Sequence, residues 1–92
     1  MHKLDLLLRR PSTFRIMKVL LERRGEYLSK YAIAKLAELD KVSNALSLLE
    51  ELGWVRALDQ RGIRKYAANL ENPEVGALDR FFRDLKYYGD AS

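Results

Sequence analysis

The stretch from Ser29 to Gly53 constrains the fold more than any other part of this chain. Its apolar residues recur at helical spacing, first around Ile33 and Leu36, which predicts two helices joined by a tight turn. Ser29 is expected to cap the first helix and Asp40 the second, because their side-chain oxygens can accept free amide hydrogens. Gly53 is expected at the left-handed position that ends the second helix. The second apolar stripe comprises Val42, Ala45, Leu46, Leu49 and Leu52.

The opposite face of the second helix carries small polar side chains, Ser43, Asn44 and Ser47, with Lys41 near its start. Ser and Asn are weak helix formers, because they compete for backbone hydrogen bonds. Short hydrogen-bonding side chains near a helix N-terminus suit a helix that enters the major groove of DNA. An ordinary solvent-exposed face is the alternative, and the helical pair alone does not decide between the two.

After Gly53 the apolar period changes from helical to alternating, which predicts a β-hairpin with strands at 54–59 and 63–68. The loop at 60–62 contains Gly62, which can adopt a positive φ. Basic residues cluster at this loop. The hairpin is therefore either the edge of a sheet whose positive charge keeps it soluble, or a basic finger that contacts a phosphate backbone or minor groove. The preceding helical pair favours the finger. The cations on the loop and its flanks are Arg56, Arg61, Arg64 and Lys65.

The chain before Ser29 predicts two further helices and a short strand. A first helix over residues 2–9 is interrupted by Pro11, because the residue before a proline avoids the helical region. Ser12 or Thr13 is expected to cap a second helix that reaches about Arg24 and ends at Gly25. Residues 26–28 are too few for a helix and could form a strand that pairs with the hairpin.

A strong helix start follows the hairpin: Asn72 as the cap, Pro73 at the first position and Glu74 as an acid in the first turn. We expect this helix to run to about Tyr88, before Gly89. It could fold back on its own domain or form a dimer interface, where aromatic residues are enriched. The aromatic content favours the dimer. The candidate interface residues are Val75, Leu78, Phe81, Phe82, Leu85 and Tyr88.

Composition narrows the function classes. The chain of 92 residues has no Cys and a single His, His2, which argues against metal binding, a cofactor and nucleophilic catalysis. A Gly-rich phosphate loop and paired catalytic acids are also missing, so an enzyme is not expected. Net charge is +4, with +5 in residues 1–24, +1 in 25–69 and −2 in 70–92. We expect a cytoplasmic protein with no membrane span and a contact surface away from the C-terminal segment.

The order of the predicted elements resembles that of winged helix-turn-helix domains: a helix, a short strand, two helices, a basic hairpin and a terminal helix. The closest likeness is to small archaeal and bacterial transcription regulators of the ArsR and MarR type. The residues that carry it are Ile33-Ala34-Lys35, Val42-Ser43-Asn44-Ala45-Leu46 and Leu49-Glu50-Glu51-Leu52-Gly53-Trp54-Val55. The resemblance implies a mainly α fold with a small β-hairpin. It divides the chain into a DNA-binding domain at 1–72, with the helical pair at 29–53 and the wing at 54–69, and a dimerisation helix at 73–89.

The resemblance also implies a mode of binding. A recognition helix at 40–52 would enter the major groove, and the wing at 59–65 would contact the backbone or minor groove. Metal sensing is not expected, because the Cys and His ligands of metal-sensing members are absent. The turn lacks Gly, and the recognition helix has one basic residue. The residues implied in DNA binding are Lys30, Lys35, Lys41, Ser43, Asn44, Ser47, Arg61, Arg64 and Lys65.

Three hypotheses follow for the function. The first is a homodimeric regulator that binds double-stranded DNA sequence-specifically, with Asn44 as the leading base reader and no cofactor. The second is a winged-helix module that binds other proteins and no DNA. The third is an architectural protein that coats DNA without sequence preference. Salt-dependent binding with a preferred sequence distinguishes the first from the other two.

Overall fold

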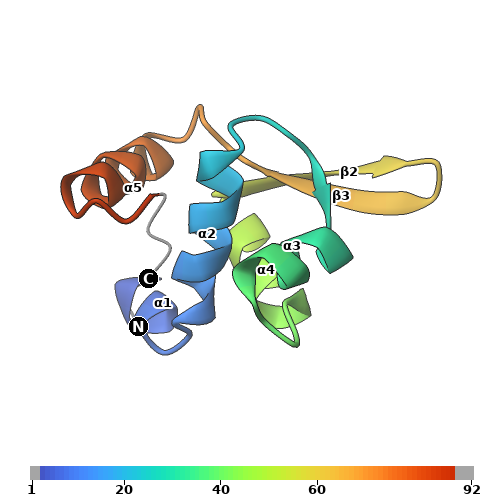
Figure 1. Cartoon of the computed structure of the whole chain (residues 1–92), viewed down its shortest axis with the longest axis horizontal. Helices are drawn as coiled ribbons and strands as arrows, with labels where there is room; N and C mark the ends of the chain where they lie inside the picture. Colours follow the sequence, from blue (N-terminus) through green and yellow to red (C-terminus); the bar gives the residue numbers. More distant parts are fainter. Residues whose placement is uncertain (1–2, 89–92) are drawn as a thin grey trace.

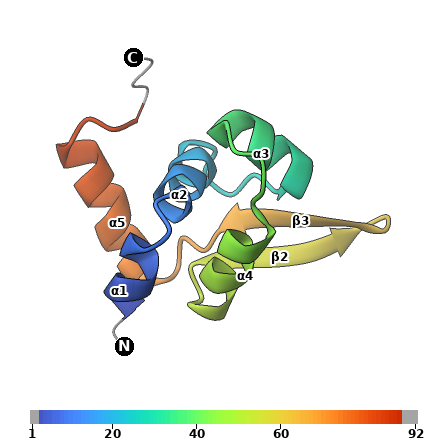
Figure 2. The ribbon, with the colours of Figure 1, turned by 90° about the horizontal axis from the view of Figure 1, so that it is seen from below.

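The computed structural model describes residues 3–88, apart from the side chains of Lys3, Leu4 and Leu6. This part of the chain forms a small α+β domain with a three-stranded antiparallel sheet (Figure 1). The hairpin and the last helix lie at opposite ends of the molecule in both ribbon views (Figures 1 and 2). The elements are α1 (Lys3–Leu8), α2 (Ser12–Glu22), β1 (Leu28–Ser29), α3 (Lys30–Ala37), α4 (Ser43–Glu51), β2 (Val55–Gln60), β3 (Ile63–Ala68) and α5 (Pro73–Asp84).

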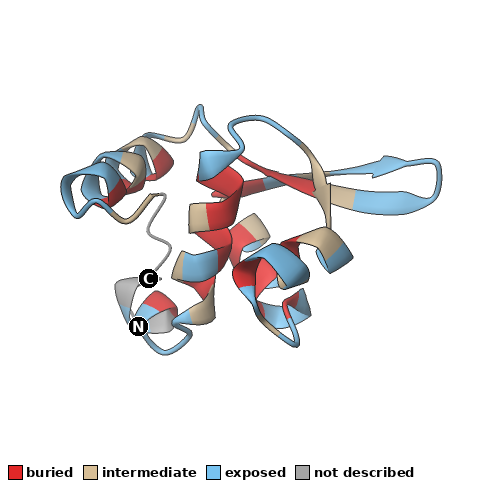
Figure 3. Cartoon of the chain, viewed as in Figure 1, coloured by how far each residue is buried: buried red, intermediate tan, exposed pale blue. Residues whose placement is uncertain are grey.

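Helix α2 lies at the centre of the core, because its apolar face meets α3, α4 and β3 (Figure 3). Ile16 and Leu20 are fully buried, and burial of such a side chain contributes about 1.5–3 kcal/mol. The predicted cap at Ser12 or Thr13 is wrong, since Pro11 occupies the N-cap position without a side-chain bond. Thr13 instead turns its hydroxyl toward the carbonyl of Arg10, to which it donates over 2.8 Å. The helix ends at Glu22, two residues before the expected boundary.

The helical pair forms as predicted, but its turn is longer. Ser29 caps α3 by accepting a hydrogen bond from the Ala32 amide, which confirms the expected cap. Helix α3 ends at Ala37, and Glu38 caps it in the left-handed conformation with φ 57°, in a turn that has no glycine. Asp40 does not cap α4, because the helix begins at Ser43 with Val42 in the cap position. Val42 is 2% exposed and its backbone is non-helical, with φ −124° and ψ −6°, so the regular helix cannot include the residues before it.

Strand β3 lies between β1 and β2 and pairs antiparallel with both. The expected strand before α3 is confirmed at Leu28–Ser29, although it begins two residues later than predicted. Gln60 pairs with Ile63, so the hairpin loop contains only Arg61 and Gly62. Their φ angles are 53° and 81°, which is the pattern of a type I′ turn. This turn matches the strand twist and lets the hairpin extend from the helices (Figure 2).

Helix α5 begins at Pro73 as predicted, with the Asn72 side chain accepting a hydrogen bond from the Glu74 amide. The expected end near Tyr88 is wrong, because the helix stops at Asp84 and Lys86 adopts a left-handed conformation with φ 56°. The following residues return to the domain, and the Tyr87 ring packs edge-on against Phe82. The expected boundary at Gly89 lies outside the described residues. None of the helices described here is long and apolar enough to cross a membrane.

Candidate nucleic-acid interface

The N-terminal half of α4 presents a polar face to solvent. Ser43, Asn44 and Ser47 are exposed, as predicted, while Ala45 and Leu46 on the other side of the helix are buried in the core. This division follows from the helical period, which places residues one and two positions apart on different sides. The hydrogen-bonding groups of these three side chains are therefore displayed by a helix whose position is fixed by core packing.

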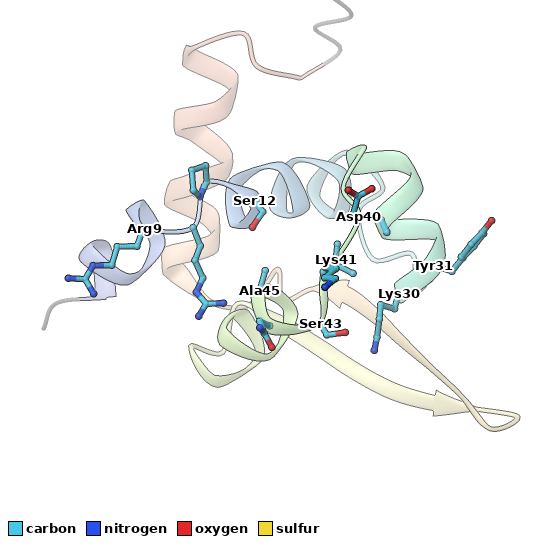
Figure 4. A pocket seen from close by; sticks show the side chains of 13 residues that line it. Arg9, Ser12, Lys30, Tyr31, Asp40, Lys41, Ser43 and Ala45 are labelled. Atoms are coloured by element: carbon cyan, nitrogen blue, oxygen red, sulfur yellow. The ribbon is translucent and has the colours of Figure 1, made fainter.

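A hollow of about 890 Å³ opens beside the start of α4 (Figure 4). It is lined from three directions: by the connection between α1 and α2, by the start of α3, and by the turn into α4. Four of its lining side chains are basic and one, Asp40, is acidic, which gives the hollow a positive balance. The lining residues are Arg9, Arg10, Pro11, Ser12, Lys30, Tyr31, Ala34, Asp40, Lys41, Val42, Ser43, Asn44 and Ala45.

The structure brings Lys30, Lys41, Ser43 and Asn44 together at this hollow, although they come from two helices and a turn. Ser47 lies one helical turn away, in a smaller hollow of about 250 Å³ that Asn44 also lines. These are five of the nine residues predicted for DNA binding. The other four lie elsewhere.

Sequence reasoning missed the contribution of Arg9, Arg10 and Tyr31 to this surface. Arg10 borders both hollows, and the side chain of Tyr31 is 80% exposed. The strongly positive N-terminal segment was the available signal for the two arginines. Their place beside α4 depends on how α1 packs, which residue spacing does not reveal.

Arg61 stands at the tip of the hairpin, away from the hollow. It is exposed and adopts the left-handed conformation that Asn, Asp and Gly favour at the first position of a type I′ turn. For an arginine this conformation costs about 1–2 kcal/mol. Strained backbone of this kind is concentrated at functional sites, which makes the tip a candidate contact.

Arg64 differs from the other predicted cations, because acids of its own chain already surround it. Its guanidinium donates to Glu50 of α4 over 2.7 Å and lies 3.6 Å from Asp59 of β2. The negative charge of Glu50, together with this hydrogen bond, raises the pKa of Arg64. The guanidinium also lies over the Tyr66 ring, 5.9 Å from its centroid. Arg64 therefore joins the hairpin to α4.

Lys65 and Lys35 are separate from this cluster. Strand alternation directs Lys65 to the opposite face of β3 from Arg64 and Tyr66, and its side chain is half-buried. Lys35 is exposed in the last turn of α3 and lines neither hollow. Both lysines add positive charge near the hairpin and α3 without sharing the surface of Asn44.

Some of the predicted interface residues on α5 are buried in the molecule, and others are exposed. Val75, Leu78 and Phe82 are buried in the core of their own chain, so they do not form a free surface for a partner. Phe81 and Leu85 are 56% and 61% exposed. Tyr88 is half-buried and packs edge-on against Phe82.

Asp79 on α5 joins the end of the described chain to the turn that follows α2. It accepts hydrogen bonds from Arg24 over 2.8 Å and from the Tyr88 hydroxyl over 2.6 Å. Burial alone would raise the pKa of Asp79, but these hydrogen bonds lower it below its ordinary value. Burial and the bond to Asp79 raise the pKa of Tyr88. The cluster is structural, because it joins α5 to the turn that follows α2 and lies outside both hollows.

Over residues 3–88 the side chains contain no group of three or more metal-binding residues close enough to hold an ion. Comparison with protein-family models, curated proteins and solved structures found no match to this chain. The function is therefore inferred from the surface itself.

Proposed function

We propose that this chain is a winged helix-turn-helix protein that regulates transcription by binding double-stranded DNA. The observation that carries the proposal is the exposed polar face of Ser43, Asn44 and Ser47 beside a hollow with a positive balance of charge. Helices α3 and α4 would form the helix-turn-helix, and the β2–β3 hairpin would be the wing. The order of elements and the packing of α3 and α4 on α2 support this assignment.

In this proposal α4 enters the major groove. An α-helix with its side chains is about 10–12 Å wide, and the groove of B-DNA is about 12 Å wide, so one helix fills it. Asn44 would read a base edge, because its amide can both donate to and accept from adenine. Lys30 and Lys41, which border the hollow, would neutralise backbone phosphates.

The wing would contact the backbone or the minor groove through Arg61 at its tip. Its charge has no acidic partner among the residues that the structure describes. Arg64 would position the wing through its bond to Glu50 rather than bind a phosphate directly. Lys35 and Lys65 would add long-range attraction for DNA.

We also propose that the protein binds DNA as a homodimer through the outer face of α5. Phe81 and Leu85 lie one helical turn apart and are both exposed, so they form an apolar strip. A two-fold dimer would place two recognition helices in half-sites roughly 34 Å apart. Sedimentation velocity of the wild type and of a Phe81→Ser/Leu85→Ser variant tests this: the wild type should sediment as a dimer and the variant as a folded monomer. A monomeric wild type would contradict it.

Fluorescence anisotropy of labelled duplex DNA, titrated with the protein at two salt concentrations and with a scrambled competitor, tests the DNA-binding function. Salt-sensitive binding with a preferred sequence is the expected result, because phosphate contacts release counterions while Asn44 discriminates between bases. Salt-sensitive binding without preference would replace the regulator with an architectural DNA-binding protein. Absence of binding at low salt would reject DNA as the ligand and favour a protein-interaction module.

A further inference from the structure

The arginines of this chain fall into two groups according to whether an acid of the same chain lies within ion-pair distance. Five of them have such a partner: Arg15, Arg24, Arg56, Arg64 and Arg83. Arg9, Arg10, Arg23, Arg61 and Arg80 have none within residues 3–88, and among these five Arg9 and Arg10 are adjacent and both exposed. Adjacent arginines without an acidic partner repel each other, so the sequence keeps two uncompensated charges at one place.

The backbone that carries this pair is held firmly. The Arg10 amide donates to the Leu7 carbonyl over 3.0 Å, and the Arg10 carbonyl accepts from the Thr13 hydroxyl over 2.8 Å. Leu7 is fully buried and anchors α1 in the core. Thr13 is also fully buried, and Pro11 limits the backbone between them. The backbone from which the side chains of Arg9 and Arg10 extend is therefore fixed relative to the core.

That position lies across α4 from the lysines. Arg9 stands on one side of the hollow and Lys30 on the other, with Ser43 between them at the start of α4 (Figure 4). Arg10 extends the positive charge along α4, because it lines the smaller hollow together with Asn44 and Ser47. The acid of this second hollow, Glu51, is on the last turn of α4 and forms no ion pair with Arg10 within the described residues.

We propose that Arg9 and Arg10 form a second phosphate-binding set, which contacts the DNA strand opposite the one contacted by Lys30 and Lys41. This inference rests on the proposed function. A helix that fills the major groove has a phosphate backbone along each of its sides. Cations on both sides of α4 would therefore bind both strands and centre Asn44 over the base edges. Arginine suits this role, because its guanidinium forms bidentate hydrogen bonds with phosphate.

The test compares two double variants with the same reduction in charge. Arg9→Gln/Arg10→Gln removes the proposed contacts, whereas Arg23→Gln/Arg80→Gln removes two exposed arginines that border neither hollow. The bonds that hold the α1–α2 connection use the backbone of Arg10, so the first variant should fold, and circular dichroism checks this. Anisotropy titrations over a range of salt concentrations give the slope of log K against log salt for each protein.

The Arg9→Gln/Arg10→Gln variant should lower the magnitude of this slope by about 0.9 for each phosphate that it no longer binds, and the control should change it much less. Arg9→Lys/Arg10→Lys, which keeps the charges, should retain most of the slope. Equal slopes for the two Gln variants would overturn the inference while leaving the proposed function intact. Wild-type protein that does not bind DNA would overturn both.

Footprinting assigns the strand. Hydroxyl-radical cleavage of a bound duplex, labelled on either strand, should show that Arg9→Gln/Arg10→Gln loses protection on one strand beside the recognition helix. Protection on the strand facing Lys30 and Lys41 should persist. Unchanged protection on both strands, or an equal decrease on both, would contradict contacts to the opposite strand.

Discussion

Arg64 of β3 donates a hydrogen bond to Glu50 of α4 over 2.7 Å, and this contact joins the hairpin to the helix that carries Asn44. The partners are 14 residues apart in the sequence and belong to elements of different type. Because Glu50 compensates the charge of Arg64, this arginine adds little electrostatic attraction for DNA. In the proposed complex its main effect is to set the angle between the wing and the recognition helix.

Glu50→Gln should increase affinity for DNA. The change removes the nearer of the two acids beside Arg64 and a negative charge from the end of α4. Of its acidic partners within residues 3–88, Arg64 then keeps only Asp59, at 3.6 Å, so it becomes available for a phosphate contact and the salt slope steepens by up to about 0.9. Titrations of duplex DNA over a range of salt concentrations measure both quantities. Glu71→Gln is the matched control, since Glu71 pairs with Arg56 over 2.9 Å and loses the same charge. Equal effects of the two variants would show that overall charge, not the Arg64 contact, controls binding.

Arg61→Asn should increase the stability of the protein and weaken its binding to DNA. Asn is favoured at this left-handed turn position, so the free energy of unfolding should rise by about 0.5–1 kcal/mol. Removal of one phosphate contact should at the same time lower the magnitude of the salt slope by about 0.9. Urea denaturation and DNA titration measure the two effects. Arg61→Lys, which keeps the charge, should leave both nearly unchanged, and a destabilised Arg61→Asn variant would refute the strain assigned to the turn.

Asn44→Ala and Lys41→Ala should weaken binding in different ways. Without the Asn44 amide the protein should lose about 1–3 kcal/mol of discrimination at one base pair and keep its salt slope. Without Lys41 it should bind all sequences less tightly, with a slope about 0.9 smaller in magnitude. Competition assays with single-base variants of a selected site distinguish the two. If Asn44→Ala kept the full preference of the wild type, base reading would have to be assigned to another residue.

Asp79 should make the free energy of unfolding depend on pH in the acid range. Its pKa is lowered in the folded protein, so its contribution is fully present above the unfolded-state pKa of about 3.9 and is lost as pH falls toward the folded value. Asp79→Asn should cost about 1.5–3 kcal/mol at pH 7 and progressively less below about pH 5. Urea denaturation across this range measures the difference. Asp84→Asn, at an exposed position of the same helix, is the matched control for the change in charge. A cost for Asp79→Asn that stays constant down to pH 3 would exclude the ion-pair mechanism.

Local chemistry explains why the sequence predicts some elements well. The caps at Ser29 and Asn72 depend on residues within three positions of each other, and both are confirmed. The hairpin follows from alternation and Gly62, and only two positions are wrong: Trp54 precedes β2, and Gln60 belongs to the strand and not to the loop. In each of these elements, short-range hydrogen bonding and backbone preference point to the same structure.

Tertiary packing decides the rest. Asp40 is a good cap in isolation, but the folded chain places the buried Val42, with a non-helical backbone, at the N-cap of α4, which takes Asp40 out of capping range. The aromatic face of α5 predicts a partner surface, yet the core takes Phe82, and Tyr87 folds back against it. Arg9 lies near α4 only because α1 packs where it does. Such contacts join distant residues and leave no periodic signal in the chain.

A titration of ¹⁵N-labelled protein with duplex DNA at low salt shows where on the surface DNA binds. The largest amide shifts should fall on Ser43, Asn44 and Ser47 of α4 and on the turn at Arg61 and Gly62. Raising the salt concentration should reverse them, because counterions compete for the phosphates. Shifts that fall on α5 and leave the amides of α4 and the hairpin unchanged would rule out DNA binding by these two elements.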